Sequence, residues 1–159
     1  MTNQTDHTGT SSFQTILLST LVVALLDTIA ATAVFYIWFK MSFVQLFQFI
    51  ASSLYGQEAF DGSSRKIVTG IIIHLVTSLI IAVVYFYAYP KIRFLSKSPV
   101  LSGLLYGLVF WLVMNLLIIP NTHIAPSPFI LSLALTSIAW HMVLVGLPAA
   151  LITRKYYQQ

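Results

Sequence analysis

The chain has 159 residues, of which 58% are hydrophobic and only 8% are Asp, Glu, Lys or Arg. A soluble globular domain carries about 25% charged residues, so this composition excludes a soluble enzyme, a nucleic-acid-binding domain and a disordered regulator. The net charge of +4 is spread thinly and forms no basic patch, so we expect no nucleic acid partner. The chain contains no cysteine, which excludes disulfides and thiol catalysis. The composition predicts an integral membrane protein in contact with the lipid bilayer.

The hydropathy pattern divides the chain into a polar tail and four apolar runs. Residues 1–15 are rich in Thr, Ser, Asn and Gln, and we expect them to form a disordered tail. The apolar runs cover residues 16–39, 67–89, 101–119 and 129–152. A helix of about 24 residues is about 36 Å long, which exceeds a hydrocarbon core of roughly 30 Å. The pattern predicts an all-α fold, an up-down four-helix bundle that forms one membrane domain over residues 16–155.

A fifth helix is predicted over residues 41–55, directly after the first span. Its polar residues recur at helical spacing: Ser42, Gln45, Gln48 and Ser52. Its large apolar residues occupy the opposite face: Phe43, Leu46, Phe47, Ile50 and Leu54. Such amphipathicity is typical of a helix that lies along the membrane–water boundary.

The distribution of basic residues predicts the orientation of the chain. Five of them fall on the side that holds both termini and the second-to-third connection: Lys91, Arg93, Lys97, Arg154 and Lys155. Three fall on the other side: Lys40, Arg65 and Lys66. Cytoplasmic loops carry the excess of Lys and Arg, so we expect both termini in the cytoplasm.

Four polar side chains inside the spans are candidates for an intramembrane site, because polar groups are costly there: Asp27, His74, Asn115 and His141. At 1.5 Å per residue, Asp27 and His141 each lie about 18 Å from the non-cytoplasmic end. His74 lies about 10 Å from that end and Asn115 about 6 Å. The depths therefore predict two layers, Asp27 with His141 and His74 with Asn115.

We hypothesise that Asp27 and His141 form a buried pair near the middle of the membrane. A lone carboxylate there is strongly disfavoured, and a neighbouring imidazole can share its proton. Such a pair could relay protons or bind a polar ligand, and the alternative is a structural clamp that fixes helix register. Small residues mark helix interfaces, which predicts packing roles for Gly70, Gly103 and Gly107.

Several kinds of chemistry are not indicated. His74 and His141 could ligate haem together, but their depth offset of about 8 Å argues against this. The sequence has no HxxH or HExxH pattern, Walker loop, dinucleotide fingerprint or Ser-His-Asp set. We therefore expect no metal, no cofactor and no enzymatic activity, and keep a haem protein or membrane enzyme as the least favoured alternative.

The order of these features resembles small bacterial four-helix inner-membrane proteins of unknown function, the YagU-like proteins. The matching stretches in the first half are Leu26-Asp27, Phe49-Ile50-Ala51-Ser52, Gly56 with Ala59-Phe60 and Gly62, and Gly70 followed by His74. Those in the second half are Tyr106-Gly107, Met114-Asn115 with Pro120, and His141 with Gly146-Leu147-Pro148. Ser53 and Ser63 depart from the pattern, which has glycines there.

This resemblance covers about residues 20–155 and implies a multi-pass protein of the bacterial plasma membrane. It supplies no activity, but it places Asp27, His74, Asn115 and His141 among the pattern residues. The leading hypothesis is transport of a small solute or of protons through a polar intramembrane site. Four helices leave little room for a lumen, so transport would call for a homo-oligomer. The alternative is a structural or accessory subunit of a larger membrane complex.

Overall fold

A computed structural model describes residues 11–159. Every regular element in that range is helical, which confirms the all-α class. Four helices are long and apolar enough to cross a membrane: Ser12–Phe39, Ser64–Ala88, Pro99–Asn121 and Leu131–Tyr157. The chain is therefore a membrane protein by the length and composition of its helices.

Helix α1 (Ser12–Phe39) begins four residues earlier than the apolar run predicts. Ser11 caps it, because its side chain accepts a hydrogen bond from the Gln14 backbone while the Gln14 side chain accepts one from the Ser11 backbone. The expected tail over residues 1–15 was therefore too long at its C-terminal end. The rest of the expected tail, residues 1–10, lies outside the described residues.

Helix α2 (Phe43–Tyr55) occupies the expected position, but its faces are used differently from the prediction. Ser42 and Gln45 form the capping box that starts it. Gln48 and Ser52, expected on the polar outer face, are buried, whereas Phe43 and Leu54 are exposed. The reason is that α2 packs against α3 (Ser64–Ala88), so tertiary contact overrides the simple division into two faces.

Short elements connect the spans. The segment η1 (Gly56–Phe60) joins α2 to α3, and α4 (Arg93–Lys97) precedes α5 (Pro99–Val113). The long connection before α6 (Leu131–Trp140) touches α2, since the His123 backbone N–H donates to Ser53 O at 3.1 Å. This connection therefore ties the fourth span to the same end of the molecule as α2.

The third and fourth spans each contain a stretch of π-helix. These are η2 (Met114–Ile118) and η4 (His141–Gly146), and η4 continues into α7 (Leu147–Tyr157). A proline follows the last π residue by two positions in both cases, Pro120 and Pro148. Proline lacks an N–H and clashes with the carbonyl four residues earlier, so the helix widens locally. After Pro120 the third span ends in the short 3₁₀ turn η3 (Ile119–Asn121).

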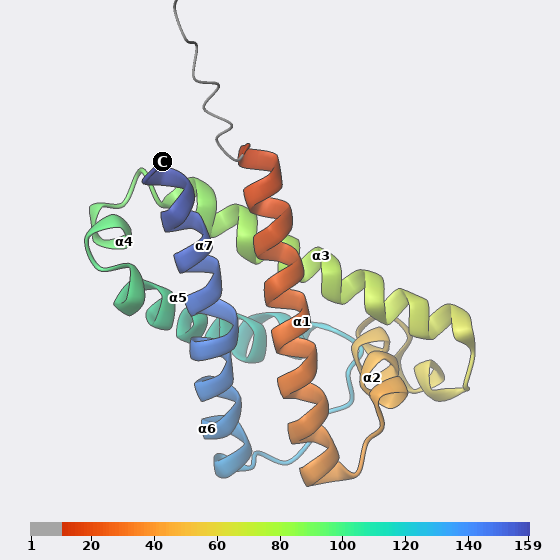
Figure 1. Cartoon of the computed structure of the whole chain (residues 1–159). Helices are drawn as coiled ribbons and strands as arrows, with labels where there is room; N and C mark the ends of the chain where they lie inside the picture. Colours follow the sequence, from red (N-terminus) through yellow and green to blue (C-terminus); the bar gives the residue numbers. More distant parts are fainter. Residues whose placement is uncertain (1–10) are drawn as a thin grey trace, which may run out of the picture.

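The spans are less parallel than the expected bundle. In Figure 1, α1 and the α6–α7 rod run in opposite directions beside each other, while α3 crosses α1 obliquely. The beginning and the end of the described chain meet, because the Ser12 hydroxyl and the Tyr156 hydroxyl are 2.7 Å apart. Both ends therefore lie at one end of the molecule, and α2 lies at the other (Figure 1).

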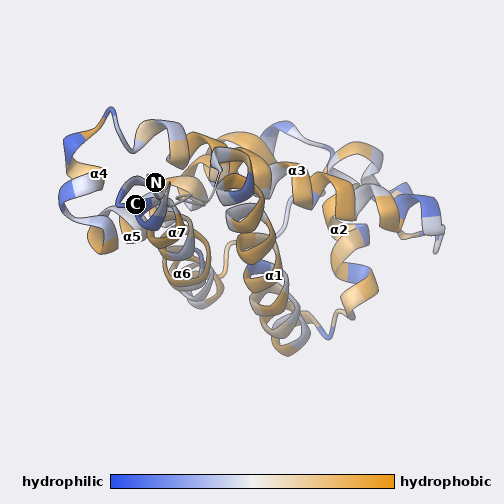
Figure 2. Cartoon of the chain, turned by 45° about the horizontal axis from the view of Figure 1, so that its top comes forward, coloured by the Kyte–Doolittle hydropathy of each residue, from blue (hydrophilic) through white to orange (hydrophobic). Residues whose placement is uncertain are grey.

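Large apolar side chains are mostly on the outside of the molecule. Leu25, Ile80 and Leu116 are among many that are exposed, and Figure 2 shows hydrophobic residues along every span, with hydrophilic residues gathered in the connections. The buried core is small and is built around Val23, Tyr85 and Val145. Such an apolar exterior is expected of a chain whose solvent is lipid.

Glycines allow the spans to approach one another closely. A Cβ on Gly107 would meet the backbone of His141 and Met142, and one on Gly103 would lie 2.8 Å from the Ala150 Cβ. Gly70 lies against the backbone of Phe47 in α2. Gly146 faces Gly103 and Gly107 from η4, although no packing role was predicted for it. Gly103 and Gly107 form the GxxxG stripe of the third span. This stripe thus packs against the fourth span of the same chain.

Candidate functional site

Asp27 lies between two histidines from different helices. Its Oδ2 is 3.9 Å from His74 Nδ1 on α3, and its Oδ1 is 3.8 Å from His141 Nε2 at the start of η4. The indole Nε1–H of Trp140 donates a hydrogen bond to the same Oδ1 at 2.9 Å. The side chains of Asp27, His74 and His141 are 20%, 12% and 13% exposed. We call these three side chains the Asp–His centre.

Backbone carbonyls fix the position of the hydrogen on each imidazole. His74 Nε2 lies 3.0 Å from Ala24 O, and His141 Nδ1 lies 2.7 Å from Ser137 O. A carbonyl can only accept, so each of these ring nitrogens carries the hydrogen. The other nitrogen of each ring therefore presents a lone pair, and both lone pairs face the carboxylate of Asp27.

The ring of His141 is also held by aromatic side chains. It stacks on Trp140 with ring centroids 5.0 Å apart and on Phe110 with centroids 6.0 Å apart. These two contacts restrict the orientation of the imidazole ring. His141 is the first residue of a π-helical stretch, a feature that occurs frequently at functional sites.

The predicted two-layer arrangement is wrong for His74. His74 contacts Asp27, although the depth count separated the two residues by about 8 Å. That count treated every span as perpendicular to the membrane, whereas α3 runs obliquely to α1 (Figure 1). Asn115 bonds to its own helix instead, since its Nδ2 donates to Trp111 O at 3.0 Å. The structure thus brings together three of the four candidate residues and gives Asn115 a local contact.

Three contributors to the centre were not predicted: Thr28, Ser137 and Trp140. The Thr28 Oγ1 lies 3.0 Å from His74 Nε2, and Ser137 supplies both a carbonyl to His141 and an Oγ that accepts from Trp111 Nε1 at 2.7 Å. Thr28 and Trp140 are the immediate chain neighbours of Asp27 and His141. This adjacency within the spans was the signal that the sequence offered.

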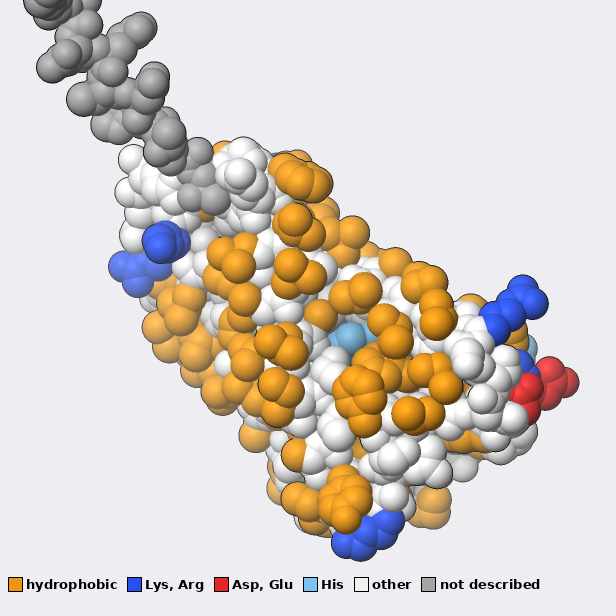
Figure 3. All heavy atoms as spheres, turned by 45° about the vertical axis from the view of Figure 1, so that its right-hand side comes forward, with side chains coloured by type: hydrophobic (Ala, Val, Ile, Leu, Met, Phe, Trp, Pro, Cys, Tyr) orange, Lys and Arg blue, Asp and Glu red, His pale blue; other side chains and the backbone are white. Residues whose placement is uncertain are grey.

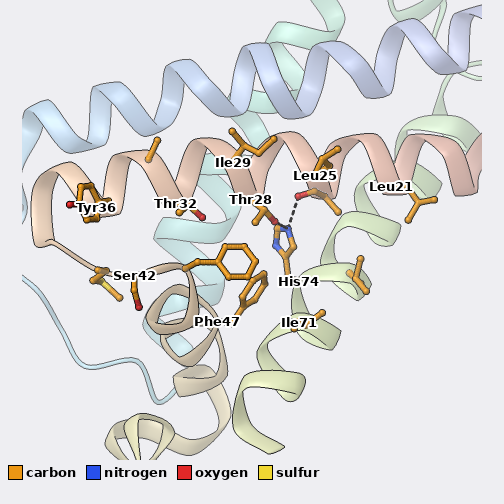
Figure 4. A pocket seen from close by; sticks show the side chains of 15 residues that line it. Leu21, Leu25, Thr28, Ile29, Thr32, Tyr36, Ser42, Phe47, Ile71 and His74 are labelled. Atoms are coloured by element: carbon orange, nitrogen blue, oxygen red, sulfur yellow. Dashed lines mark hydrogen bonds between the residues drawn. The ribbon is translucent and has the colours of Figure 1, made fainter. Parts of the chain in front are cut away.

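A groove opens onto His74 from the side of the molecule. It has a volume of about 730 Å³ and lies between α1, α2 and α3. Figure 3 shows histidine surface in a hollow that is surrounded by hydrophobic side chains. In Figure 4 the labelled side chains of Thr28, Thr32, Phe47 and His74 point toward this space, and Leu21 and Tyr36 lie toward its two ends. Asp27 does not line the groove, so His74 stands between the groove and the carboxylate.

The half of the molecule that carries the chain ends is closed by tyrosines. The Tyr85 and Ser102 hydroxyls lie 2.7 Å apart, and the Tyr106 hydroxyl donates to Ile81 O at 2.9 Å. Tyr85 is fully buried, and its ring packs edge-on against Tyr106. These tyrosine contacts therefore pack the spans together at the end of the molecule that carries the chain ends.

The carboxylate of Asp61 has a local structural contact. Its Oδ1 accepts from the Ser63 backbone at 2.9 Å just before α3, and its Oδ2 pairs with Lys66 at 2.9 Å. The hydrogen bond from Lys66 lowers the pKa of Asp61, with the Ser63 backbone as the next contribution. Asp61 therefore helps to start α3.

Comparisons with known protein families, with curated proteins and with solved structures found no match for this chain. The class of protein therefore rests on its own four spans and on the Asp–His centre within them. The resemblance to the YagU-like proteins stays a prediction.

Proposed function

We propose that this chain is a membrane protein that moves protons, and that the Asp–His centre is its proton-binding site. The observation that carries the proposal is the pair of imidazole lone pairs directed at the two oxygens of one carboxylate. Acceptors that face acceptors repel one another unless a hydrogen lies between them. A centre of this kind is stabilised by one bound proton, shared between the carboxylate and either ring.

The distances suit a proton that changes partners. At 3.8 and 3.9 Å, the nitrogen–oxygen pairs are about 1 Å beyond hydrogen-bond length, so a small side-chain rotation closes either gap. A proton shared between His74 Nδ1 and Asp27 Oδ2 can stay on Oδ2 while the carboxyl group turns, which brings Oδ2–H to His141 Nε2 and Oδ1 to His74 Nδ1. This rotation moves the proton from the α3 side of Asp27 to the η4 side.

His74 is the entry residue in this proposal because it lines the groove while Asp27 does not. We place the end of the molecule that carries α2 outside and the chain ends in the cytoplasm, in accordance with the excess of basic residues on the side of the chain ends. The plasma membrane of a bacterium is the proposed location, on the resemblance to the YagU-like proteins. The alternative role as an accessory subunit receives no support from the GxxxG stripe, which is filled by Gly146 of the same chain.

The test is proton flux into vesicles that contain the purified protein. A potassium gradient with valinomycin sets the membrane potential, and a pH-sensitive dye inside the vesicles reports proton entry. We expect flux above that of empty vesicles for the natural chain, and flux equal to that of empty vesicles for Asp27→Asn, whose amide cannot take up a proton.

Surface residues of the same types provide the matched controls. Asp61→Asn and His123→Gln change a loop carboxylate and a loop imidazole, and both should leave the flux unchanged. His141→Gln should lower the flux as Asp27→Asn does. Flux from the natural chain that does not exceed empty vesicles would overturn the proposal, as would full flux from Asp27→Asn.

A further inference from the structure

We propose that the groove between α1, α2 and α3 is a binding site for a membrane quinone, whose two carbonyl oxygens accept hydrogen bonds from Thr28 and Thr32. The groove volume of about 730 Å³ is within the usual range for a small-molecule site. This inference concerns a ligand and stands independently of proton movement.

The groove selects for a neutral molecule that dissolves in the bilayer. It is lined almost entirely by apolar side chains, and Leu25 and Ile29 at its rim are exposed on the outer face of α1. Within residues 11–159 no Lys or Arg lines it, so it offers no permanent positive charge to a phosphate or a carboxylate. The aromatic side chains of Tyr36, Phe43 and Phe47 also line it, and aromatic side chains pack favourably against flat rings.

Two threonines that line the groove have hydroxyl hydrogens without an acceptor within residues 11–159. His74 Nε2 carries its own hydrogen, so the nearby Thr28 hydroxyl cannot donate to it, and its hydrogen stays available. Thr32 Oγ1 is buried and has no hydrogen-bond partner within residues 11–159. A helical threonine populates two side-chain rotamers, so Thr32 can turn its hydroxyl toward the groove. A buried hydroxyl without a partner is costly, and a ligand acceptor would remove that cost.

The Cβ atoms of these two threonines are about as far apart as the two oxygens of a para-quinone. Thr28 and Thr32 are one helical turn apart, which separates their Cβ atoms by about 5–6 Å. Two C=O bonds of about 1.2 Å across a six-membered ring place the quinone oxygens roughly 5 Å apart. A ring that lies along α1 can therefore meet both hydroxyls, and its prenyl chain can leave the groove sideways into the lipid.

The test is photolabelling of the full-length protein in lipid nanodiscs with an azido-quinone, followed by mass spectrometry of the labelled peptides. We expect saturable labelling of α1 near Thr28 and Thr32 and of α2 near Phe47, which an excess of unlabelled decylubiquinone removes. An alkyl diazirine without carbonyls should label all lipid-facing helices without saturation. Azido-quinone labelling that is spread evenly over the spans, or that decylubiquinone does not reduce, would overturn the proposal.

Single substitutions separate hydrogen bonding from mere lipid contact. Thr32→Val keeps the side-chain shape and removes a hydroxyl without a protein partner, so we expect thermal stability at least equal to that of the natural chain and about fivefold weaker quinone competition. Thr136→Val is the matched control, because Thr136 is exposed on α6 and bonds only to Ser132 O of its own helix. Equal competition in Thr32→Val and Thr136→Val would contradict the role given to Thr32. Proton flux plays no part in this assay, so the two proposals can fail separately.

Discussion

Gly107→Ala should destabilise the protein by about 3 kcal/mol or more. The added Cβ would lie on the backbone of His141 and Met142, and neither the carbonyl nor the Cα there can move without separating the third span from the fourth. Unfolding in detergent, followed by circular dichroism or by resistance to heat, measures the loss. The same separation would shift His141, so proton flux should fall as well.

Other substitutions provide a ranking that checks this explanation. Gly70→Ala meets the backbone of Phe47 and should be about as harmful, whereas Gly103→Ala first meets the Ala150 Cβ and should be milder. Val109→Ala changes a lipid-exposed position on the same helix and should have little effect. In a helix without such contacts, alanine is about 1 kcal/mol better than glycine. A Gly107→Ala protein that is more stable than the natural chain would therefore refute the close approach.

Asp27→Leu and Asp27→Asn should differ sharply in stability. Leucine leaves the buried Trp140 indole N–H without its acceptor and removes the polar group that faces the two imidazole nitrogens, so we expect a loss of roughly 2–4 kcal/mol. Asparagine keeps an oxygen for Trp140 and offers an N–H to an imidazole lone pair, so it should stay within about 1 kcal/mol of the natural chain. Thermal unfolding of the three proteins in one detergent measures both differences.

This comparison separates a structural clamp from a proton site. A clamp that only fixes helix register would be satisfied by asparagine, and flux and stability would both survive in Asp27→Asn. A proton site loses its flux in Asp27→Asn while the fold persists. Equal stability of the leucine and asparagine variants would show that the hydrogen bonds at Asp27 contribute little to the fold.

The sequence predicted the fold class well because membrane spans are set by length and hydropathy, which are local properties. The four apolar runs correspond to the four long helices, with ends that differ by a few residues. The π-helical stretches were not predicted, although their cause, a proline two residues after each stretch, is visible in the sequence as Pro120 and Pro148. The buried face of α2 was also missed, because only its contact with α3 decides which face is covered.

For the candidate site, the sequence predicted the participating residues more accurately than it predicted their contacts. Polar side chains in lipid have few partners, so Asp27 and His141 could be paired by depth alone. His74 was placed in another layer because a depth count contains no information about helix tilt. The tautomers of His74 and His141 depend on the carbonyls of Ala24 and Ser137, and these contacts exist only in the folded chain.

The most direct test of the proton-binding centre is nuclear magnetic resonance of protein labelled with ¹⁵N in histidine and ¹³C in aspartate. The chain has 4 histidines, and His→Gln variants assign each signal. We predict hydrogen on Nε2 of His74 and on Nδ1 of His141, together with one further proton seen either as an imidazolium or as a protonated Asp27, and absent in Asp27→Asn. Two neutral rings beside an ionised Asp27 would contradict the account.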